Sequence, residues 1–152
     1  MPGRCRHWYR KWGPDVTDYG RDISCMGSLK TGRLVTGTRV VAEAVYRRLI
    51  TPRGTLRGGE NEADYGLDLL DLIGGTFTAS DALALPGRIS NELEKDERIT
   101  SVSVGVNRVV EGPAIYVTVT IECTTDAGPF TLVLGVDGVT VAVLNLDEGE
   151  TV

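Results

Sequence analysis

The sequence predicts an α+β fold in which three helices pack on a mostly antiparallel β meander, preceded by an N-terminal arm. Apolar residues recur at helical spacing between residues 36 and 95, and at every second position between residues 99 and 146. Segments rich in glycine and proline separate these regions. A chain of 152 residues, 41% of them hydrophobic, is long enough for one domain with its own core.

The first helix is expected over residues 36–50. Val41, Val45 and Leu49 share one face of it, which predicts an apolar stripe turned to the core. Thr36 or Thr38 is expected to cap its start. Pro52 is expected to end it, because the residue before a proline avoids helical geometry.

A short second helix is expected to begin at Asp64, which would act as its cap, and to end at residues 74–75, which are both glycine. A third helix is expected to start near Thr78 or Ser80 and to run to about Lys95, with Ala82, Leu85, Ile89 and Leu93 on one face. Pro86 lies inside that span and predicts either a kink or a second helix start.

Four strands are expected after residue 99. The run 115–124 alternates apolar and polar residues, which predicts a strand with one face on the core. Residues 130–136 and 139–146 form a hairpin around Asp137-Gly138, a strong two-residue turn signal. The last strand is apolar on both faces, which predicts cover on both sides or pairing with a strand from a partner.

The charges are divided along the chain. Residues 1–53 hold 11 Lys or Arg and 4 Asp or Glu, a net charge of +7, whereas residues 54–152 hold 5 and 17, a net charge of −12, which together give −5. The two parts are expected to attract each other within one chain or head to tail between molecules. A basic arm alone would indicate nucleic acid.

Residues 1–21 are predicted to be a basic aromatic arm, residues 22–146 the domain, and residues 147–152 an acidic tail. Trp8, Tyr9 and Trp12 alternate in the arm with the basic residues Arg4, Arg6, Arg10 and Lys11. Three interpretations stay open. The rings pack back on the domain, they anchor in a partner's pocket as Trp and Tyr do at interfaces, or they stack on single-stranded nucleic acid.

The residue types that carry most enzyme chemistry are sparse. His7 is the single histidine, and the three cysteines fit neither zinc nor redox spacing. No catalytic, cofactor-binding or metal-binding residue is predicted, and no cofactor. The abundant carboxylates, Glu92 among them, are interpreted as solvated surface, although sequence alone leaves a glycosidase pair open. With no signal segment and no membrane span, the protein is expected to be made and used in a cytoplasm.

Two motifs resemble a known family. The first is residues 47–54, Arg-Arg-Leu-Ile-Thr-Pro-Arg-Gly, followed by residues 64–69, Asp-Tyr-Gly-Leu-Asp-Leu. The second is Asp96-Glu97-Arg98, where the family has Glu-Pro-Arg. Together they resemble the sheath-initiator or baseplate-wedge family of contractile phage tails, over about residues 22–146.

The resemblance implies a structural virion protein rather than an enzyme, assembled in the host cytoplasm, with a fold similar to the inner domain of tail sheath proteins. Six copies would surround the tail tube at the baseplate and offer β-strands to the first sheath ring. The implied partners are tail sheath, baseplate wedge and tail tube proteins, with no membrane. A lysozyme-like hydrolase, a label that some members of the family carry, and a nucleic-acid adaptor that uses the basic arm are the alternatives.

Three groups of residues are the predicted sites. Arg53, Asp96 and Arg98 are expected to make wedge contacts or ion pairs within the fold. The segment 130–146 is expected to face the sheath, through Phe130, Leu132, Leu134, Val139, Val141 and Val143. Trp8, Tyr9 and Trp12 are the expected anchors of the arm.

Overall fold

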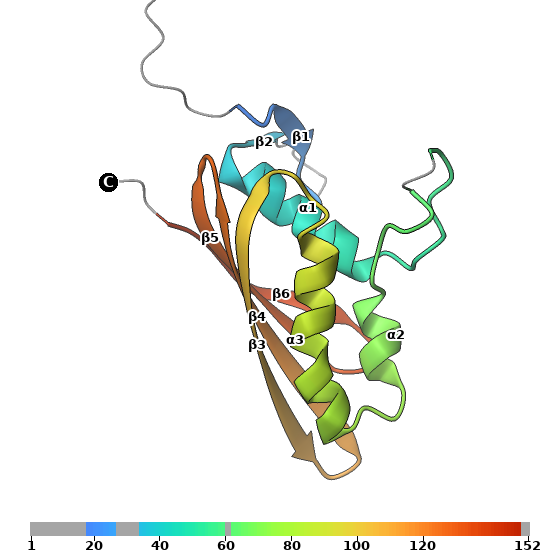
Figure 1. Cartoon of the computed structure of the whole chain (residues 1–152). Helices are drawn as coiled ribbons and strands as arrows, with labels where there is room; N and C mark the ends of the chain where they lie inside the picture. The colour runs from blue at the N-terminus through green and yellow to red at the C-terminus, as the bar shows by residue number, and fades with distance from the viewer. Residues whose placement is uncertain (1–17, 27–33, 60–61, 150–152) are drawn as a thin grey trace, which may run out of the picture.

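The computed structural model describes residues 18–26, 34–59 and 62–149. Within them, three helices pack on one face of a four-stranded antiparallel sheet, and a two-stranded hairpin lies at one end (Figure 1). The predicted α+β class is thus confirmed for this part of the chain. The expected arm anchors Trp8, Tyr9 and Trp12 lie outside the described residues.

Helix α1 (Thr38–Ile50) buries Val41, Val45 and Leu49, as predicted. Neither threonine caps it. The cap position is Gly37, whose φ of 64° suits glycine, and no side chain bonds the first turn. At the other end Thr51 is extended, as expected of a residue before proline.

Helix α2 (Leu69–Gly74) begins later than predicted. Its cap is Asp68, not Asp64, and the Asp68 carboxylate accepts a hydrogen bond from the Asp71 amide. Asp68 has φ 54°, a left-handed conformation that aspartate tolerates better than most residues. Asp64 lies in the preceding loop instead and forms ion pairs with Arg53 and Lys95.

Helix α3 (Ala79–Leu93) starts with a capping box. The Thr78 hydroxyl accepts from the Asp81 amide, and the Asp81 carboxylate accepts from the Thr78 amide. These bonds hold the pKa of Asp81 below its usual value. The helix continues through Pro86, which therefore marks no second start.

The large sheet has the strand order β3-β4-β5-β6, the meander that the alternating pattern predicts. Its strands are β3 (Ile99–Glu111), β4 (Ala114–Thr125), β5 (Gly128–Val136) and β6 (Val141–Glu148). Val139 lies in the turn before β6 rather than in the strand, and β6 runs into the predicted acidic tail. The hairpin of β1 (Arg21–Ile23) and β2 (Leu34–Thr36) was not predicted.

The core lies between the helices and one face of the sheet (Figure 1). Alternate residues of the two central strands are buried there, namely Val117, Val119, Ile121, Cys123, Phe130, Leu132, Leu134 and Val136. On the other face Tyr116 is 45% and Leu144 60% exposed. Among the described residues, the last hairpin is therefore covered on one face and not on both. In the same residues, no helix has the length and apolar character needed to cross a membrane.

Candidate functional site

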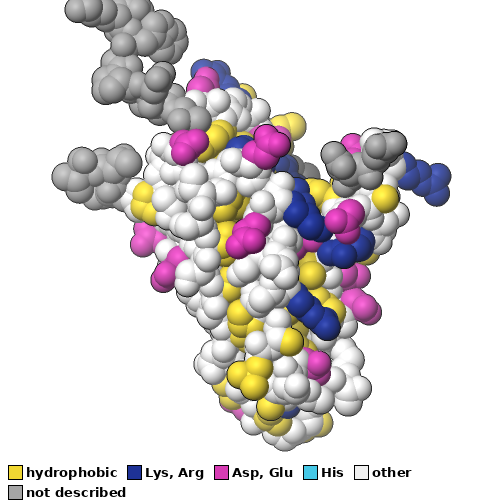
Figure 2. Space-filling view, in the orientation of Figure 1, with side chains coloured by type: hydrophobic (Ala, Val, Ile, Leu, Met, Phe, Trp, Pro, Cys, Tyr) yellow, Lys and Arg dark blue, Asp and Glu magenta, His cyan; other side chains and the backbone are white. Residues whose placement is uncertain are grey.

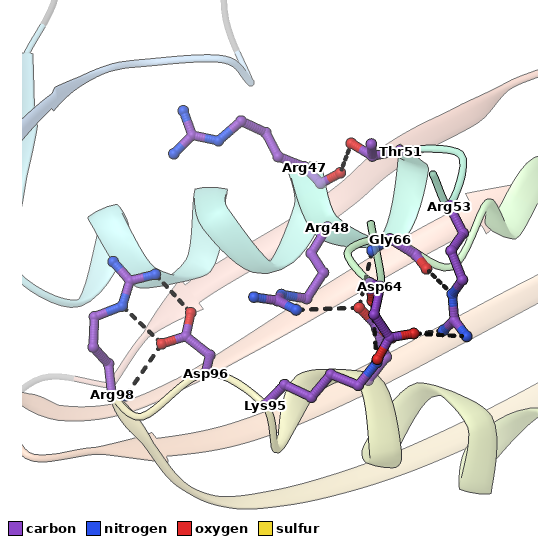
Figure 3. Close-up of polar contacts among 10 residues, drawn as sticks. Arg47, Arg48, Thr51, Arg53, Asp64, Gly66, Lys95, Asp96 and Arg98 are labelled. Atoms are coloured by element: carbon purple, nitrogen blue, oxygen red, sulfur yellow. Dashed lines mark hydrogen bonds and ion pairs between the residues drawn. The ribbon is translucent and has the colours of Figure 1, made fainter. Parts of the chain in front are cut away.

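The densest group of charged contacts lies where the end of α1, the loop 51–68 and α3 meet. Figure 2 shows basic and acidic side chains side by side on this part of the surface. We call the group formed by Arg48, Arg53, Asp64, Glu92 and Lys95 the Glu92 cluster. Figure 3 labels its members Arg48, Arg53, Asp64 and Lys95. Its central carboxylate is 1% exposed.

Both oxygens of Glu92 are fully engaged. Oε1 accepts from Arg48 Nη1 at 3.1 Å and from the Gly66 amide at 3.0 Å. Oε2 accepts from Arg53 Nη2 and from Lys95 Nζ, each at 2.9 Å. A buried carboxylate with this many charge-assisted bonds satisfies the condition under which a buried charge is tolerated.

Asp64 closes the cluster from the solvent side. It lies 2.8 Å from Lys95 Nζ and 3.3 Å from Arg53 Nη1. The hydrogen bond from Lys95, together with the positive charges nearby, lowers the pKa of Asp64. Asp64 thus stays ionised and gives Arg53 and Lys95 a second carboxylate partner besides Glu92.

Gly66 brings the loop against the end of α1. Its φ is 103°, and a Cβ there would collide with the carbonyl oxygen of Thr51. The Leu67 amide donates to Arg48 O, and the Asp68 amide donates to Thr51 O. Arg53 Nε also donates to the Gly66 carbonyl at 3.1 Å. The residues of the first family-like motif therefore form one compact unit that joins α1, the loop and α3.

The second motif forms a separate ion pair before β3. Arg98 Nε and Nη2 reach the two oxygens of Asp96 at 2.9 and 2.6 Å, and the Arg98 amide donates to Oδ1 at 3.1 Å. Burial by itself would raise the pKa of Asp96, but the bonds and charge of Arg98 outweigh burial and lower it. Arg53, Asp96 and Arg98 are thus all paired within the fold, in two clusters rather than one.

The carboxylates of the two clusters can be compared with the acid of a glycosidase. A glycosidase acid needs a raised pKa, whereas the pKa values of Asp64 and Asp96 are lowered. Within the described part of the chain, no group of three or more His, Cys, Asp or Glu residues is placed to hold a metal ion. The lysozyme-like alternative receives no support from these two groups.

The segment predicted to face the sheath divides into a buried and an accessible part. Phe130, Leu132 and Leu134 lie in the core, and β5 is paired on both sides, by β4 and by β6. A partner therefore cannot pair with β5 while the sheet is intact. Val141 and Val143 of β6 are half-buried on the helix side.

Strand β6 borders a groove of about 700 Å³. Tyr46, Ile50, Leu70 and Val141 line its apolar part. Tyr46 Oη donates to the Val141 carbonyl at 3.4 Å, a long bond between α1 and β6. Among the described residues, β6 pairs with β5 only, so no strand pairs with its outer edge.

Sequence reasoning missed the centre of the Glu92 cluster. Glu92 was interpreted as surface, but it lies three positions after Ile89 and seven after Leu85, on the same helix face as these two core residues. A charge on an apolar stripe is the signal that could have identified it. Lys95 is three residues away, but its other three partners come from segments 26 to 44 residues away, which the sequence alone does not bring together.

Comparisons of this chain with protein-family models, with curated proteins and with solved structures find no match. The family suggested by residues 47–54 and 64–69 therefore stays a prediction. The partners that this family implies stay predictions as well.

Proposed function

We propose that this chain is a structural protein of a contractile-tail baseplate that starts sheath polymerisation by strand addition at β6. The observation that carries the proposal is that, in the described part of the chain, no strand pairs with the outer edge of β6. Residues 141–146 of β6 contain no charged side chain, and the two charges of the strand, Asp147 and Glu148, lie at its C-terminal end. Charged residues are the usual protection of an exposed edge strand, and an uncharged stretch of edge favours pairing with another chain.

The surroundings of β6 suit an incoming strand. Its unpaired backbone groups supply affinity, while alternate side chains of the added strand supply register. One set would enter the groove beside Tyr46, Ile50 and Leu70, and the other would lie toward the exposed face of the sheet. An added strand that suits these surroundings has apolar residues at the positions that enter the groove and small or polar residues at the alternate positions.

In this proposal the Glu92 cluster and the Asp96–Arg98 pair hold the frame. They fix the loop 51–68 against α3 and hold the turn that leads into β3. The proposal includes a fold similar to the inner domain of tail sheath proteins, six copies around the tail tube, and contacts with wedge and tube proteins. It places the protein in the virion.

Proline substitutions at two consecutive positions of β6 test the proposal. Consecutive residues of an edge strand point their amides to opposite sides, so one of Ala142→Pro and Val143→Pro removes an outward amide and the other removes a bond to β5. The outward variant is expected to keep the fold, as edge prolines do, and to lose sheath assembly. Electron microscopy of baseplates with tail tubes and added sheath protein measures the assembly.

The matched control uses the opposite edge of the sheet, β3, through Val104→Pro and Gly105→Pro. The outward variant of that pair is expected to fold and to support assembly. If both folded outward variants support assembly, or if sheath grows equally without the protein, the proposal fails. If only the β3 variant blocks assembly, strand addition occurs at the other edge and the assignment to β6 is wrong.

A further inference from the structure

The sheet has an exposed face, opposite the helices, that carries no positive charge. We call it the open face. From residue 109 to the end, the chain contains no Lys, Arg or His. Arg108, the last basic residue, belongs to the helix side, where its Nε donates to the Phe77 carbonyl.

One end of the open face is acidic. Glu122 and Asp147 are both exposed, and both stand opposite Thr131, one on each side of it. Two strand spacings separate them, about 10 Å. Neither forms an ion pair within the described residues. Two uncompensated like charges at this spacing favour a positively charged occupant.

The other end of the open face is apolar. Val109 stands opposite Tyr116, and both are more than a third exposed. Leu144, which is 60% exposed, projects over Gly135, so that a Cβ at that glycine would lie 3.1 Å from a Leu144 methyl group. A hollow of about 280 Å³ lies between them, lined mainly by apolar atoms, with Tyr116, Gly135, Ala142 and Leu144 among its residues and Asp137 as its one charged residue. Its size and apolar lining suit an aromatic side chain.

The chain itself contains a segment with the complementary chemistry. Residues 1–17 hold four Lys or Arg and one Asp, and both tryptophans of the protein. The described structure begins at residue 18, and Tyr19 packs against the core close to Arg98, immediately before β3. This is the end of the sheet at which Ile99 pairs with Thr125, the same end as Glu122 and Asp147 (Figure 1).

The length of the segment matches the distance it must cover. From Thr125 to Tyr116 there are nine residues of β4, about 30 Å. The ten residues from Asp18 back to Trp8 span at most about 35 Å when extended, and residues 1–7 add further length. Basic residues and aromatic rings can therefore reach the acidic and apolar ends of the same face.

We propose that residues 1–17 bind the open face of their own sheet, with the aromatic rings of the segment at the Tyr116–Leu144 hollow and its basic residues beside Glu122 and Asp147. This inference is independent of the strand addition proposed at β6, because it concerns a face of the sheet and leaves the outer edge of β6 free. It selects one of the three interpretations that the sequence left open for the arm.

Tryptophan fluorescence of the full chain tests the inference, because both tryptophans lie in the segment and no other part of the protein contributes. The emission is expected to be blue-shifted and poorly quenched by acrylamide relative to a peptide of residues 1–17. Leu144→Lys, and separately Glu122→Lys with Asp147→Lys, are expected to move both values toward those of the peptide. Added salt should do the same, because it screens the charge attraction.

The matched control is Leu83→Lys, at a leucine of α3 that is 86% exposed and lies far from the open face in the fold. It is expected to leave the emission unchanged, and circular dichroism checks that every variant folds. Emission equal to that of the peptide, or insensitive to the open-face variants, overturns the inference. The inference is also overturned if sedimentation shows a dimer and the tryptophans become accessible to acrylamide when it is diluted, since the occupant of the open face is then a second copy. It is overturned as well if the tryptophans are protected from acrylamide only when an oligonucleotide is added.

Discussion

Glu92 is the residue on which the largest number of charged contacts depends. Three basic side chains and one backbone amide point to its two oxygens, and the carboxylate is buried. A buried ion pair contributes little net stability by itself, but removal of one partner leaves the other charges without compensation. The intact cluster thus adds little to the free energy of unfolding, whereas loss of one of its members lowers that free energy strongly.

We therefore expect Glu92→Gln to lower the free energy of unfolding by about 3–5 kcal/mol, the usual cost of breaking a buried charge pair. Urea unfolding followed by circular dichroism measures the change. Glu94→Gln, two positions along and exposed, is the control and is expected to stay within about 0.5 kcal/mol of the unaltered protein. Equal effects of the two substitutions would show that the cluster does not support the fold.

The Glu92 cluster holds the loop 51–68 in place. Two glycines of this loop allow the effect of backbone strain at positive φ to be compared with that of a steric collision. Gly54 and Gly66 both have positive φ, at 79° and 103°, but only Gly66 lies against the backbone of Thr51. Gly54→Ala is expected to cost about 1–2 kcal/mol, from left-handed backbone strain alone. Gly66→Ala is expected to cost clearly more, since its Cβ collides with a carbonyl oxygen.

The comparison of these two midpoints in urea measures the additional cost at Gly66, where the collision with Thr51 O adds to a positive φ that both glycines have. Equal costs would mean that the loop moves away from Thr51 without loss. A Gly66→Ala protein that unfolds partially, with α1 and the sheet intact, would place the loop in a separate unit of stability.

The elements could be predicted from sequence wherever one local pattern decides them. The apolar stripe of α1 and the alternation of β4 locate these elements, and the capping box of α3 is also local. Contacts distant in sequence decide the remainder. Asp64 resembles a helix cap in the sequence, but Lys95 and Arg53 bind it in the loop, and Asp68 caps α2 instead.

Burial of whole strands was equally beyond local reasoning. Phe130, Leu132 and Leu134 show the same alternation as an interface strand, and only the sheet order places β5 in the interior. The ion pairs of Arg53 and Arg98 were anticipated as one of two alternatives. Glu92 was missed because its partners come together only through the packing of α1, the loop and α3.

At the scale of the whole molecule, the carboxylates link stability to pH. Every Asp or Glu in the described residues with a resolved shift has a lowered pKa, and these residues are Asp22, Glu43, Asp64, Asp81, Asp96 and Asp137. A carboxyl group whose pKa is lower in the folded than in the unfolded state contributes stability above the unfolded value. That contribution is lost as the pH falls through the folded value.

We therefore expect the free energy of unfolding to be nearly constant from pH 7 to about pH 5 and to fall below about pH 4, where the unfolded carboxyl groups begin to bind protons.

Asp96 should account for a distinct share of this loss of stability in acid, because its carboxylate is 10% exposed and bonds Arg98 through both oxygens. Asp96→Asn is expected to be less stable at pH 7 and to lose less stability between pH 4 and pH 2. Urea midpoints at half-unit pH intervals measure both slopes, with Glu97→Gln as the exposed neighbouring control. Parallel curves for Asp96→Asn and the unaltered protein would show that the Asp96–Arg98 pair does not couple folding to protonation, and the acid loss would then belong to the other carboxylates.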